Sequence, residues 1–525
     1  MIVASYVMIV LNTGFWHRLV NLFEGQPLVW GCFAAGTWTL TLLLLELFGP
    51  GPLQKPVAAL LILVAAVAHY YESAFGVLID DEMVRNVFET TVAESRHLIT
   101  ADALLRIGLT GVLPAALVFW PRIARRPLWH QVWRWPVGIA VTASLTVAFV
   151  LTDYKAYSAA LREHHDLMGS YQPGATLNAV LRFAKAQIPT VAIEAKPYGT
   201  DAQPGPLLEA AEKPVLLVLF VGETVRAQNF GLNGYDRNTT PELARRPVIA
   251  FTDVTACGTS TAVSVPCMFS PLNSEEYEHE AFLGSENLLD VLGHAGFDVK
   301  WWDNNTGDQK VAERTGWQTI DPTLDQAACA QGECTDAVFL PLIRQQAAEI
   351  TRNTVLVLHM IGSHGPAYYL RYPPEAAAYL PDCRTASFSD CSNEQIVNTY
   401  DNTIRETDRV LSGALDILSE ADGVTPAMLY LSDHGESLGE NGLYLHAAPS
   451  FMAPEQQTKV PMVMWLSQGF ESALGLDGTC MAGLAGRPAS HDNLFHTVLG
   501  LLDVETEVRS DPLDLTAGCR PVEGA

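Results

Sequence analysis

The chain has 525 residues, of which 49% are hydrophobic and only 17% are charged, whereas soluble domains average about 25% charged residues. This composition excludes intrinsic disorder over most of the chain and argues against a purely soluble protein. The 58 acidic residues outnumber the 32 lysines and arginines, which gives a formal net charge of -26. Such a chain should repel nucleic acids, so we expect no nucleic-acid partner.

Apolar residues are concentrated before residue 156, where five segments approach the about 20 residues that span a bilayer core. These predicted membrane spans are residues 2–20, 28–47, 57–74, 104–120 and 137–151. For the first segment a cleaved signal peptide is an alternative, but no basic region precedes it and no clean small-residue cleavage site follows it. We therefore expect a transmembrane domain with five helices over residues 1–156.

The loops between the predicted spans differ in charge. Residues 121–136 contain four arginines and no acid, whereas residues 75–103 contain six acids and two arginines. Because loops rich in lysine and arginine stay in the cytoplasm, residues 121–136 should be cytoplasmic and residues 75–103 should face outward. With five spans, everything after residue 152 then lies outside the cytoplasm.

The pattern after residue 152 indicates two further parts. Residues 153–182 are typical of an amphipathic helix at a membrane surface, and residues 196–214 are rich in Pro, Gly and Glu like a linker, so we assign 157–213 as a bridge. From residue 214 to 525, short apolar runs alternate with amphipathic segments such as 393–418. The runs at 215–221, 298–302, 354–360, 427–431 and 460–466 predict buried strands of a mostly parallel sheet.

The cysteines support an extracytoplasmic location for the last part. Cys32 lies inside a predicted span, and the other eight cysteines all follow residue 256. An even number in an oxidising compartment favours disulfides, although spacing alone does not prove the pairing. Close spacing favours Cys257–Cys267, Cys329–Cys334 and Cys383–Cys391, which leaves Cys480–Cys519 by elimination. A zinc ribbon is less favoured because no C-x2-C pair is present.

Polar side chains follow three of the predicted strands. Glu223 follows the first strand, His364 follows the third, and Asp433 and His434 follow the fourth, with His446 twelve residues later. A further loop, residues 257–261, presents three hydroxyl groups. Carboxylates, histidines and a hydroxyl form a plausible zinc set, and active sites of such sheets lie at the carboxyl ends of the strands. Each residue alone is more often a cap or a surface residue, but three such strand ends in one domain favour a site.

Several longer motifs then carry a resemblance to a known family. They are GET at 222–224, NGY at 233–235, CGTSTAVSVPCMFS at 257–270, DNN at 303–305, HGP at 364–366 and SDHGESLGENGLYLH at 432–446. Together they closely resemble the phosphoethanolamine transferases that modify lipid A, a family that includes the mobile colistin-resistance enzymes. The resemblance covers nearly the whole chain.

The resemblance implies roles for individual residues near the predicted site. It implies that Thr261 is the nucleophile and that Glu223, Asp433 and His434 hold zinc with Thr261 as the fourth ligand. It implies that His364 and His446 bind the substrate phosphate, bind a second metal ion or supply the leaving-group proton. Asn305 and Lys310 match substrate contacts, but the family usually places a lysine where this chain has Gln309.

The resemblance also extends to the outward loop. Asn86, Thr90 and Glu94 match the family's contacts to the ethanolamine side of the lipid, and their spacing puts them on one face of a helix. From spacing alone, a solvated helix face is the alternative. Glu94 could pair with the ethanolamine ammonium.

For the whole chain, the resemblance implies a membrane-anchored α/β protein of the bacterial inner membrane. Its periplasmic catalytic domain would have an alkaline-phosphatase-like or sulfatase-like fold. The implied reaction transfers phosphoethanolamine from phosphatidylethanolamine to a phosphate of lipid A and releases diacylglycerol. The implied partners are these membrane lipids, with one zinc ion or two, and we expect a monomer. Alternatives are transfer of phosphoethanolamine or phosphoglycerol to another envelope glycan, a sulfatase, and a non-enzymatic envelope sensor.

Overall fold

The computed structural model describes residues 1–47, 53–89, 96–122, 128–186, 194–330 and 332–520. The chain forms two compact units. The first unit comprises Met1–Val87 and Leu98–Ile188, and the second comprises Phe88–His97 and Pro189–Ala525. Each unit has a hydrophobic core of its own.

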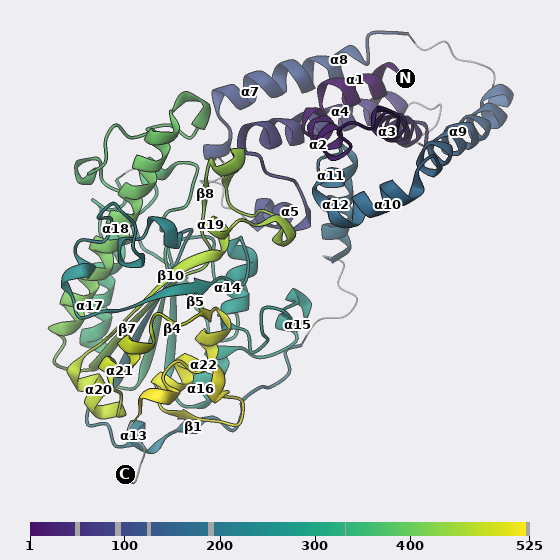
Figure 1. Ribbon diagram of the computed structural model, residues 1–525. Coiled ribbons are helices and arrows are strands. Elements are labelled where there is room, and N and C mark those ends of the chain that lie inside the picture. The colour runs from purple at the N-terminus through teal and green to yellow at the C-terminus, as the bar shows by residue number, and fades with distance from the viewer. Residues whose placement is uncertain (48–52, 90–95, 123–127, 187–193, 331, 521–525) are drawn as a thin grey trace. The chain divides into compact units, whose positions relative to one another are not determined.

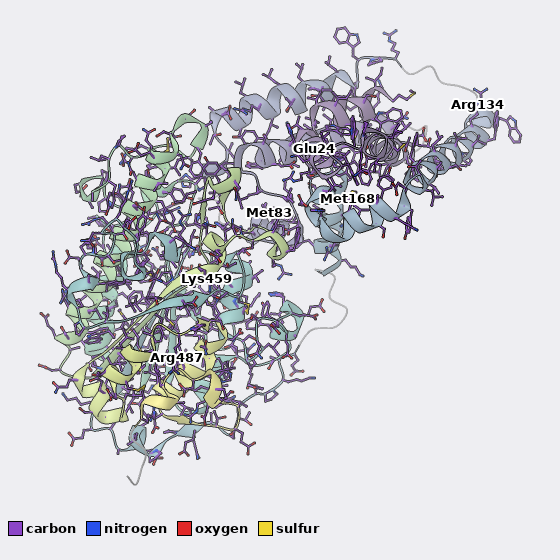
Figure 2. All side chains as sticks on the ribbon, viewed as in Figure 1. Glu24, Met83, Arg134, Met168, Lys459 and Arg487 are labelled. Carbon is purple, nitrogen blue, oxygen red and sulfur yellow. A yellow bond between two sulfur atoms is a disulfide. The ribbon has the colours of Figure 1, made fainter. Side chains whose placement is uncertain are left out.

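The first unit contains three helices long and apolar enough to cross a membrane, among the residues that the structure describes. They are α3 (Pro27–Leu47), α4 (Gln54–Phe75) and the Trp133–Leu151 part of α9 (Leu128–Leu151). Arg134 lies on α9 (Figure 2). These helices correspond to the predicted spans 28–47, 57–74 and 137–151.

The other two predicted spans are broken, so the expected five long helices are three in the described chain. Residues 2–20 form two short helices, α1 (Ile2–Val10) and α2 (Thr13–Leu22). Between them the amide of buried Asn12 donates to the Val7 carbonyl over 3.0 Å and to the Gln172 carbonyl over 2.9 Å. A polar side chain that competes for backbone groups in this way interrupts a helix.

The predicted span 104–120 is helical but irregular. It consists of α7 (Ala101–Ile107), a π-helical turn (Gly108–Val112) and α8 (Leu113–Leu117). Pro114 has no N–H to donate within the helix, and the π turn lies directly before α8. Neither of the two broken segments contains a single helix of spanning length.

The predicted amphipathic helix at 153–182 consists of three shorter helices. They are α10 (Tyr154–Glu163), α11 (His165–Gly169) and α12 (Gly174–Ala186), and α5 (Asp81–Glu89) precedes them in the chain. Aromatic side chains hold α10 to α3, since the rings of Tyr157 and Phe33 lie 5.1 Å apart. The α10 part of the bridge therefore packs on a helix of the first unit.

The second unit is built on an eight-stranded sheet with the strand order β11-β3-β10-β7-β2-β6-β4-β5 (Figure 1). Strand β10 is antiparallel to both of its neighbours, and the other pairs in this sheet are parallel. In chain order the strands are β2 (Val215–Gly222), β3 (Ile249–Thr255), β4 (Asp298–Asp303), β5 (Trp317–Thr319), β6 (Thr354–His359), β7 (Thr425–Ser432), β10 (Lys459–Leu466) and β11 (Ala489–Ser490). The mostly parallel sheet and the five expected strands are confirmed.

Helices cover both faces of the sheet (Figure 1). One face carries α14 (Thr261–Phe269), α16 (Leu288–His294) and α22 (Asp492–Leu501), and the other carries α17 (Phe339–Glu349) and α18 (Asn393–Ser419). All eight residues of β2 are buried because the strand has helices on both sides. Its alternate residues Val215, Leu217 and Leu219 join one core with residues of α14. On the opposite face, the ring of Phe220 lies 6.4 Å from that of Phe339 in α17.

Smaller elements complete the second unit. They are β1 (Gln203–Pro204), α13 (Pro206–Glu209), α15 (His279–Leu283), β8 (Ser437–Leu438), β9 (Tyr444–Leu445), α19 (Glu455–Thr458), α20 (Gln468–Leu474), α21 (Gly478–Leu484) and β12 (Val504–Glu505). Strand β1 pairs with β12, so the segment expected as a linker is attached to the second unit.

The structure contains the four predicted disulfides. They are Cys257–Cys267, Cys329–Cys334, Cys383–Cys391 and Cys480–Cys519. Cys32, in α3, is a free cysteine. All four disulfides lie in the second unit, which is consistent with an oxidising environment for that unit.

Candidate functional site

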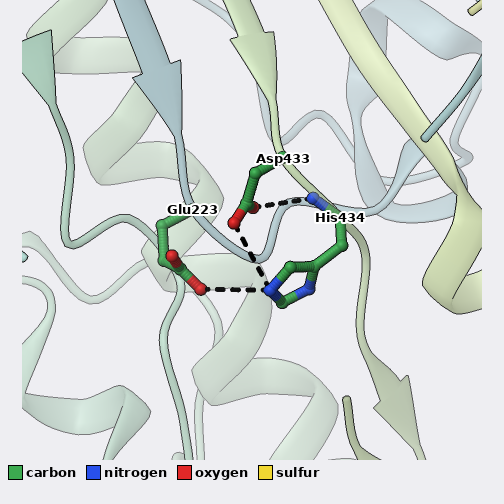
Figure 3. A group of neighbouring side chains, drawn as sticks. All are labelled: Glu223, Asp433 and His434. Atoms are coloured by element: carbon green, nitrogen blue, oxygen red, sulfur yellow. Dashed lines mark hydrogen bonds and ion pairs between the residues drawn. The ribbon is translucent and has the colours of Figure 1, made fainter. Parts of the chain in front are cut away.

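Three potential metal ligands meet at the carboxyl ends of two neighbouring strands. Glu223 follows β2, and Asp433 and His434 follow β7, which pairs with β2 in parallel so that Gly222 lies opposite Ser432. The ligand atoms of the three side chains lie within 4.8 Å of one another, and all three residues are fully buried (Figure 3). We call these three residues the metal group.

Within the metal group, Asp433 Oδ2 and His434 Nε2 are the two atoms best placed to bind a cation, because both Glu223 oxygens accept hydrogen bonds from neighbouring side chains. Asp433 Oδ1 accepts the backbone N–H groups of Thr224 and His434, whereas its buried Oδ2 has no hydrogen-bond partner. His434 Nδ1 lies 2.9 Å from the Gly435 carbonyl, so its other nitrogen, Nε2, is the one directed at the carboxylates. Nε2 lies 3.4 Å from both Glu223 Oε1 and Asp433 Oδ2. Two carboxylates and one imidazole suit a divalent transition metal such as zinc.

The charges in this group also fit a cation. Burial and the Glu223 carboxylate raise the pKa of Asp433 to about 7. Burial by itself lowers the pKa of His434, but the adjacent Asp433 and Glu223 carboxylates outweigh it and raise the pKa to about 10. Both shifts arise because two carboxylates are buried together, and a divalent cation among them would offset their negative charge.

Thr261 places a hydroxyl group against the metal group. It is the first residue of α14, its Oγ1 donates to Glu223 Oε2 over 2.9 Å, and the same oxygen lies 3.4 Å from His434 Nε2. The Cys257–Cys267 disulfide closes the loop that carries it. The neighbouring hydroxyl of Thr259 donates instead to the Ala448 carbonyl over 2.8 Å. Thr261 is therefore the hydroxyl of this loop that contacts the metal group, and a helix N-terminus beside it favours a phosphate.

Two of the predicted histidines lie beside the metal group. The ring of His446 is 4.6 Å from the ring of His434 and 5.2 Å from that of His364, measured between centroids. Both His364 and His446 are buried. The loop before His364 is close to Glu223, since a Cβ atom on Gly362 would lie 2.3 Å from the Glu223 carbonyl oxygen. Gly362 also has a φ of +48°, so glycine suits both the backbone conformation and the space.

Of the two predicted contacts near the DNN motif, the structure brings one to the site. Asn305 Nδ2 donates to Glu223 Oε2 over 2.7 Å and to the Met360 carbonyl over 2.9 Å. Lys310 is exposed and pairs with Glu313 at 3.1 Å. Gln309 and Lys310 both have a left-handed backbone, with φ of 49° and 69°, and this turn carries the lysine away from the expected position.

Of the three predicted contacts in the outward loop, the structure describes Asn86. Asn86 lies on α5 of the first unit. Thr90 and Glu94 lie outside the described residues.

Two residues of the site were not singled out from the sequence. Glu436 Oε2 lies 3.1 Å from His446 Nδ1, and the signal for it was its place three residues after Asp433 in the same motif. His491 precedes α22, and its Nδ1 accepts the N–H of Cys257 over 3.1 Å while its Nε2 contacts the Ser432 carbonyl at 3.0 Å. Burial lowers the pKa of His491 to about 3, so it is a neutral link between the Thr261 loop and the end of β7. No sequence motif marks it.

Comparisons with known proteins agree with this arrangement. A family model described as phosphoethanolamine transferase EptA/EptB matches residues 37–188, and a sulfatase family model matches residues 216–504. Phosphoethanolamine transferase EptA of Escherichia coli strain K12 is 37% identical over 534 aligned residues, which cover 99% of this chain and 96% of that protein. Phosphatidylethanolamine transferase Mcr-1 of Escherichia coli is 33% identical over 87% of this chain and 85% of its own.

A solved structure is also similar over the full length. It is the integral membrane protein lipooligosaccharide phosphoethanolamine transferase A from Neisseria meningitidis, which matches with a TM-score of 0.94 at 32% identity. The match covers 99% of this chain and 98% of that chain. With the hydroxyl, the metal group and these relatives together, the chain belongs to the phosphoethanolamine transferase family.

Proposed function

We propose that the protein transfers phosphoethanolamine from phosphatidylethanolamine to a phosphate of lipid A, through a covalent intermediate on Thr261. The observation that carries this proposal is the Thr261 hydroxyl, held at a helix N-terminus within hydrogen-bond distance of Glu223 and next to His434. Relatives whose names state phosphoethanolamine transfer support the transferred group. A relative named Kdo(2)-lipid A phosphoethanolamine 7''-transferase supports a lipid A glycolipid as the acceptor, and the choice of a phosphate as the acceptor group is part of our proposal.

Glu223, Asp433 and His434 are the residues that would hold zinc. When bound, zinc would make the Thr261 hydroxyl easier to deprotonate and offset negative charge at the phosphorus. A second ion would need His364 and His446, whose rings lie 5.2 Å apart.

The protein's own residues then account for two half-reactions. In the first, Thr261 Oγ1 loses its proton along its hydrogen bond to Glu223 and bonds to phosphorus, while the bond from phosphorus to the glycerol oxygen breaks. Diacylglycerol leaves after its oxygen takes a proton from a buried histidine beside the site, His446 or His364. In the second, an acceptor phosphate oxygen bonds to phosphorus, and Thr261 Oγ1 leaves and regains its proton. Asn305 keeps Glu223 oriented throughout.

The membrane arrangement belongs to the same proposal. The broken segments 2–22 and 101–117 also cross the bilayer, which gives five crossings and a periplasmic second unit. Leu104, Leu109 and Leu113 are each more than half exposed, and apolar side chains exposed in this way suit contact with lipid. Both substrates are lipids, so anchoring keeps the enzyme in their plane. A monomer suffices because the metal group and Thr261 come from one chain.

Mass spectrometry of lipid A tests this proposal. Cells that express the protein should contain lipid A heavier by one phosphoethanolamine group, and cells that express Thr261→Ala should not. Unmodified lipid A together with a phosphoethanolamine-bearing envelope glycan would identify a different acceptor. Unmodified lipid A and glycans in both strains would overturn the proposed transfer.

A further inference from the structure

Glu436 is a buried carboxylate next to the metal group but outside it. It follows β7 and is fully buried. Its two oxygens have different partners: Oε1 accepts the hydroxyl of Tyr368 over 2.7 Å, and Oε2 lies 3.1 Å from His446 Nδ1. A carboxylate is costly to bury without charged or hydrogen-bonding partners, so this position requires a reason.

The surroundings of Glu436 fix it in place. The Tyr368 ring stacks on Phe388 at 5.6 Å and meets the edge of Tyr400 at 5.5 Å. A Cβ atom on Gly365 would lie only 2.6 Å from the Tyr368 ring, so the tyrosine is closely packed on that side too. Arg226 donates to the backbone carbonyl of Glu436 over 3.0 Å. The carboxylate is thus held by packing and hydrogen bonds on several elements.

This contact determines how His446 can act. When a carboxylate accepts a hydrogen bond from one ring nitrogen, that nitrogen keeps its proton and the other nitrogen is left for chemistry. In His446 the carboxylate is at Nδ1, so Nε2 is the nitrogen left to meet a substrate. The His446 ring already lies 4.6 Å from His434, beside the metal group.

We propose that Glu436 is a positioning residue that orients His446 to protonate the glycerol oxygen in the first half-reaction; this rests on the proposed function. There, the Thr261 Oγ1–phosphorus bond forms, the phosphorus–glycerol oxygen bond breaks, and its electron pair takes the proton from His446 Nε2. The Glu436 carboxylate keeps Nδ1 occupied so that Nε2 faces the leaving oxygen, and His446 regains a proton from solvent afterwards. In the second half-reaction the leaving oxygen belongs to Thr261 and no glycerol oxygen leaves, so the role of Glu436 proposed here concerns the first half-reaction only.

The test compares two donors that differ in their leaving group. Phosphatidylethanolamine releases a glycerol oxygen that needs a proton, whereas 4-nitrophenyl phosphoethanolamine releases a phenolate that is stable near neutral pH. The full-length protein in detergent micelles is mixed with each donor without acceptor, and the rate of modification of Thr261 is followed by quenched peptide mass spectrometry. The variants are Glu436→Gln and His446→Ala, each alone and together. The matched control is Asp408→Asn, which changes a buried carboxylate that accepts the backbone N–H groups of Glu242 and Leu243.

We expect Glu436→Gln to slow modification by phosphatidylethanolamine about a hundredfold, the usual scale of acid–base catalysis, but to change the rate with the aryl donor less than about threefold. The double variant should be no slower than His446→Ala, because both changes remove one function. Asp408→Asn should leave the ratio of the two rates, with phosphatidylethanolamine and with the aryl donor, unchanged. Equal losses with both donors, or no loss with either, would overturn the role of Glu436. No modification of Thr261 in the unaltered protein would instead overturn the proposed function.

Discussion

At the level of single residues, the Thr261 hydroxyl contacts both Glu223 and His434. Replacing Thr261 therefore tests the proposed nucleophile by a change in transfer activity, while the fold is checked independently. Thr261→Ala should keep the fold and lower transfer by at least about a thousandfold, because the nucleophilic oxygen is lost. Thr261→Ser should retain part of the activity, since the oxygen remains. Peptide mapping after incubation with a soluble phosphatidylethanolamine analogue should find phosphoethanolamine on Thr261. Label on Thr259 or Ser260 would show that the nucleophile is assigned to the wrong hydroxyl.

Asn305 and Lys310 give a second comparison at this scale. Asn305→Ala removes the donor to Glu223 Oε2, and the loss of such a supporting contact should lower metal affinity or activity about 10–100-fold. Lys310→Ala should change both by less than about twofold, because the lysine is exposed and its partner Glu313 is a surface acid. Metal titration and transfer assays on both variants check this. A large loss in Lys310→Ala alone would mean that the lysine reaches the substrate despite its position here.

At the level of elements, the disulfide Cys257–Cys267 should matter more for activity, and the disulfide Cys480–Cys519 should matter more for thermal stability. The first spans 10 residues around Thr261, and the second spans 39 residues between α21 and the end of the described chain. Longer closed loops stabilise more, within a usual range of about 2–4 kcal/mol. Removing Cys480–Cys519 by paired serine substitutions should therefore lower the melting temperature more, whereas removing Cys257–Cys267 should lower activity more. Equal activity losses would contradict a special role for the Thr261 loop.

The elements also show how far the sequence predicts the structure. The uninterrupted apolar runs of β2 and β7 mark central strands, because both of their faces are buried. Strand β5 was missed because its three residues are all exposed, and β3 because Thr252 and Asp253 interrupt its apolar pattern. The break at Asn12 depends on a partner 160 residues away, which no local pattern can indicate.

In the candidate site too, some residues were predictable from the local sequence pattern and others depend on contacts between distant parts of the chain. Glu223, Asp433 and His434 were predictable because each comes directly after a strong strand pattern, and parallel neighbours bring those ends together. Glu436 contacts His446 and His491 contacts Cys257, and both contacts exist only in the folded chain. The position of Lys310 depends on two successive left-handed residues that are not glycine, a conformation that residue type does not indicate.

For the whole molecule, the arginine-rich residues 121–136 predict the orientation. A reporter that is active only in the periplasm should be active when fused after residue 525, and a reporter that is active only in the cytoplasm should be inactive there. Fusion of the same reporters within residues 121–136 should give the reverse pattern. Activity of the cytoplasmic reporter at the end of the chain would contradict both the periplasmic location and the orientation.

The disulfide Cys257–Cys267 around Thr261 has a consequence for when a newly synthesised chain becomes active. Disulfides form in oxidising compartments, whereas the cytosol keeps cysteine thiols reduced. On the proposed periplasmic location, a chain whose second unit has not yet been exported would lack the closed loop that carries Thr261 beside Glu223. Oxidation of Cys257 and Cys267 would then serve as a maturation step that follows export. Phosphatidylethanolamine on the cytosolic side of the membrane would be protected from a premature enzyme, and the supply of oxidant would set how quickly new molecules become competent.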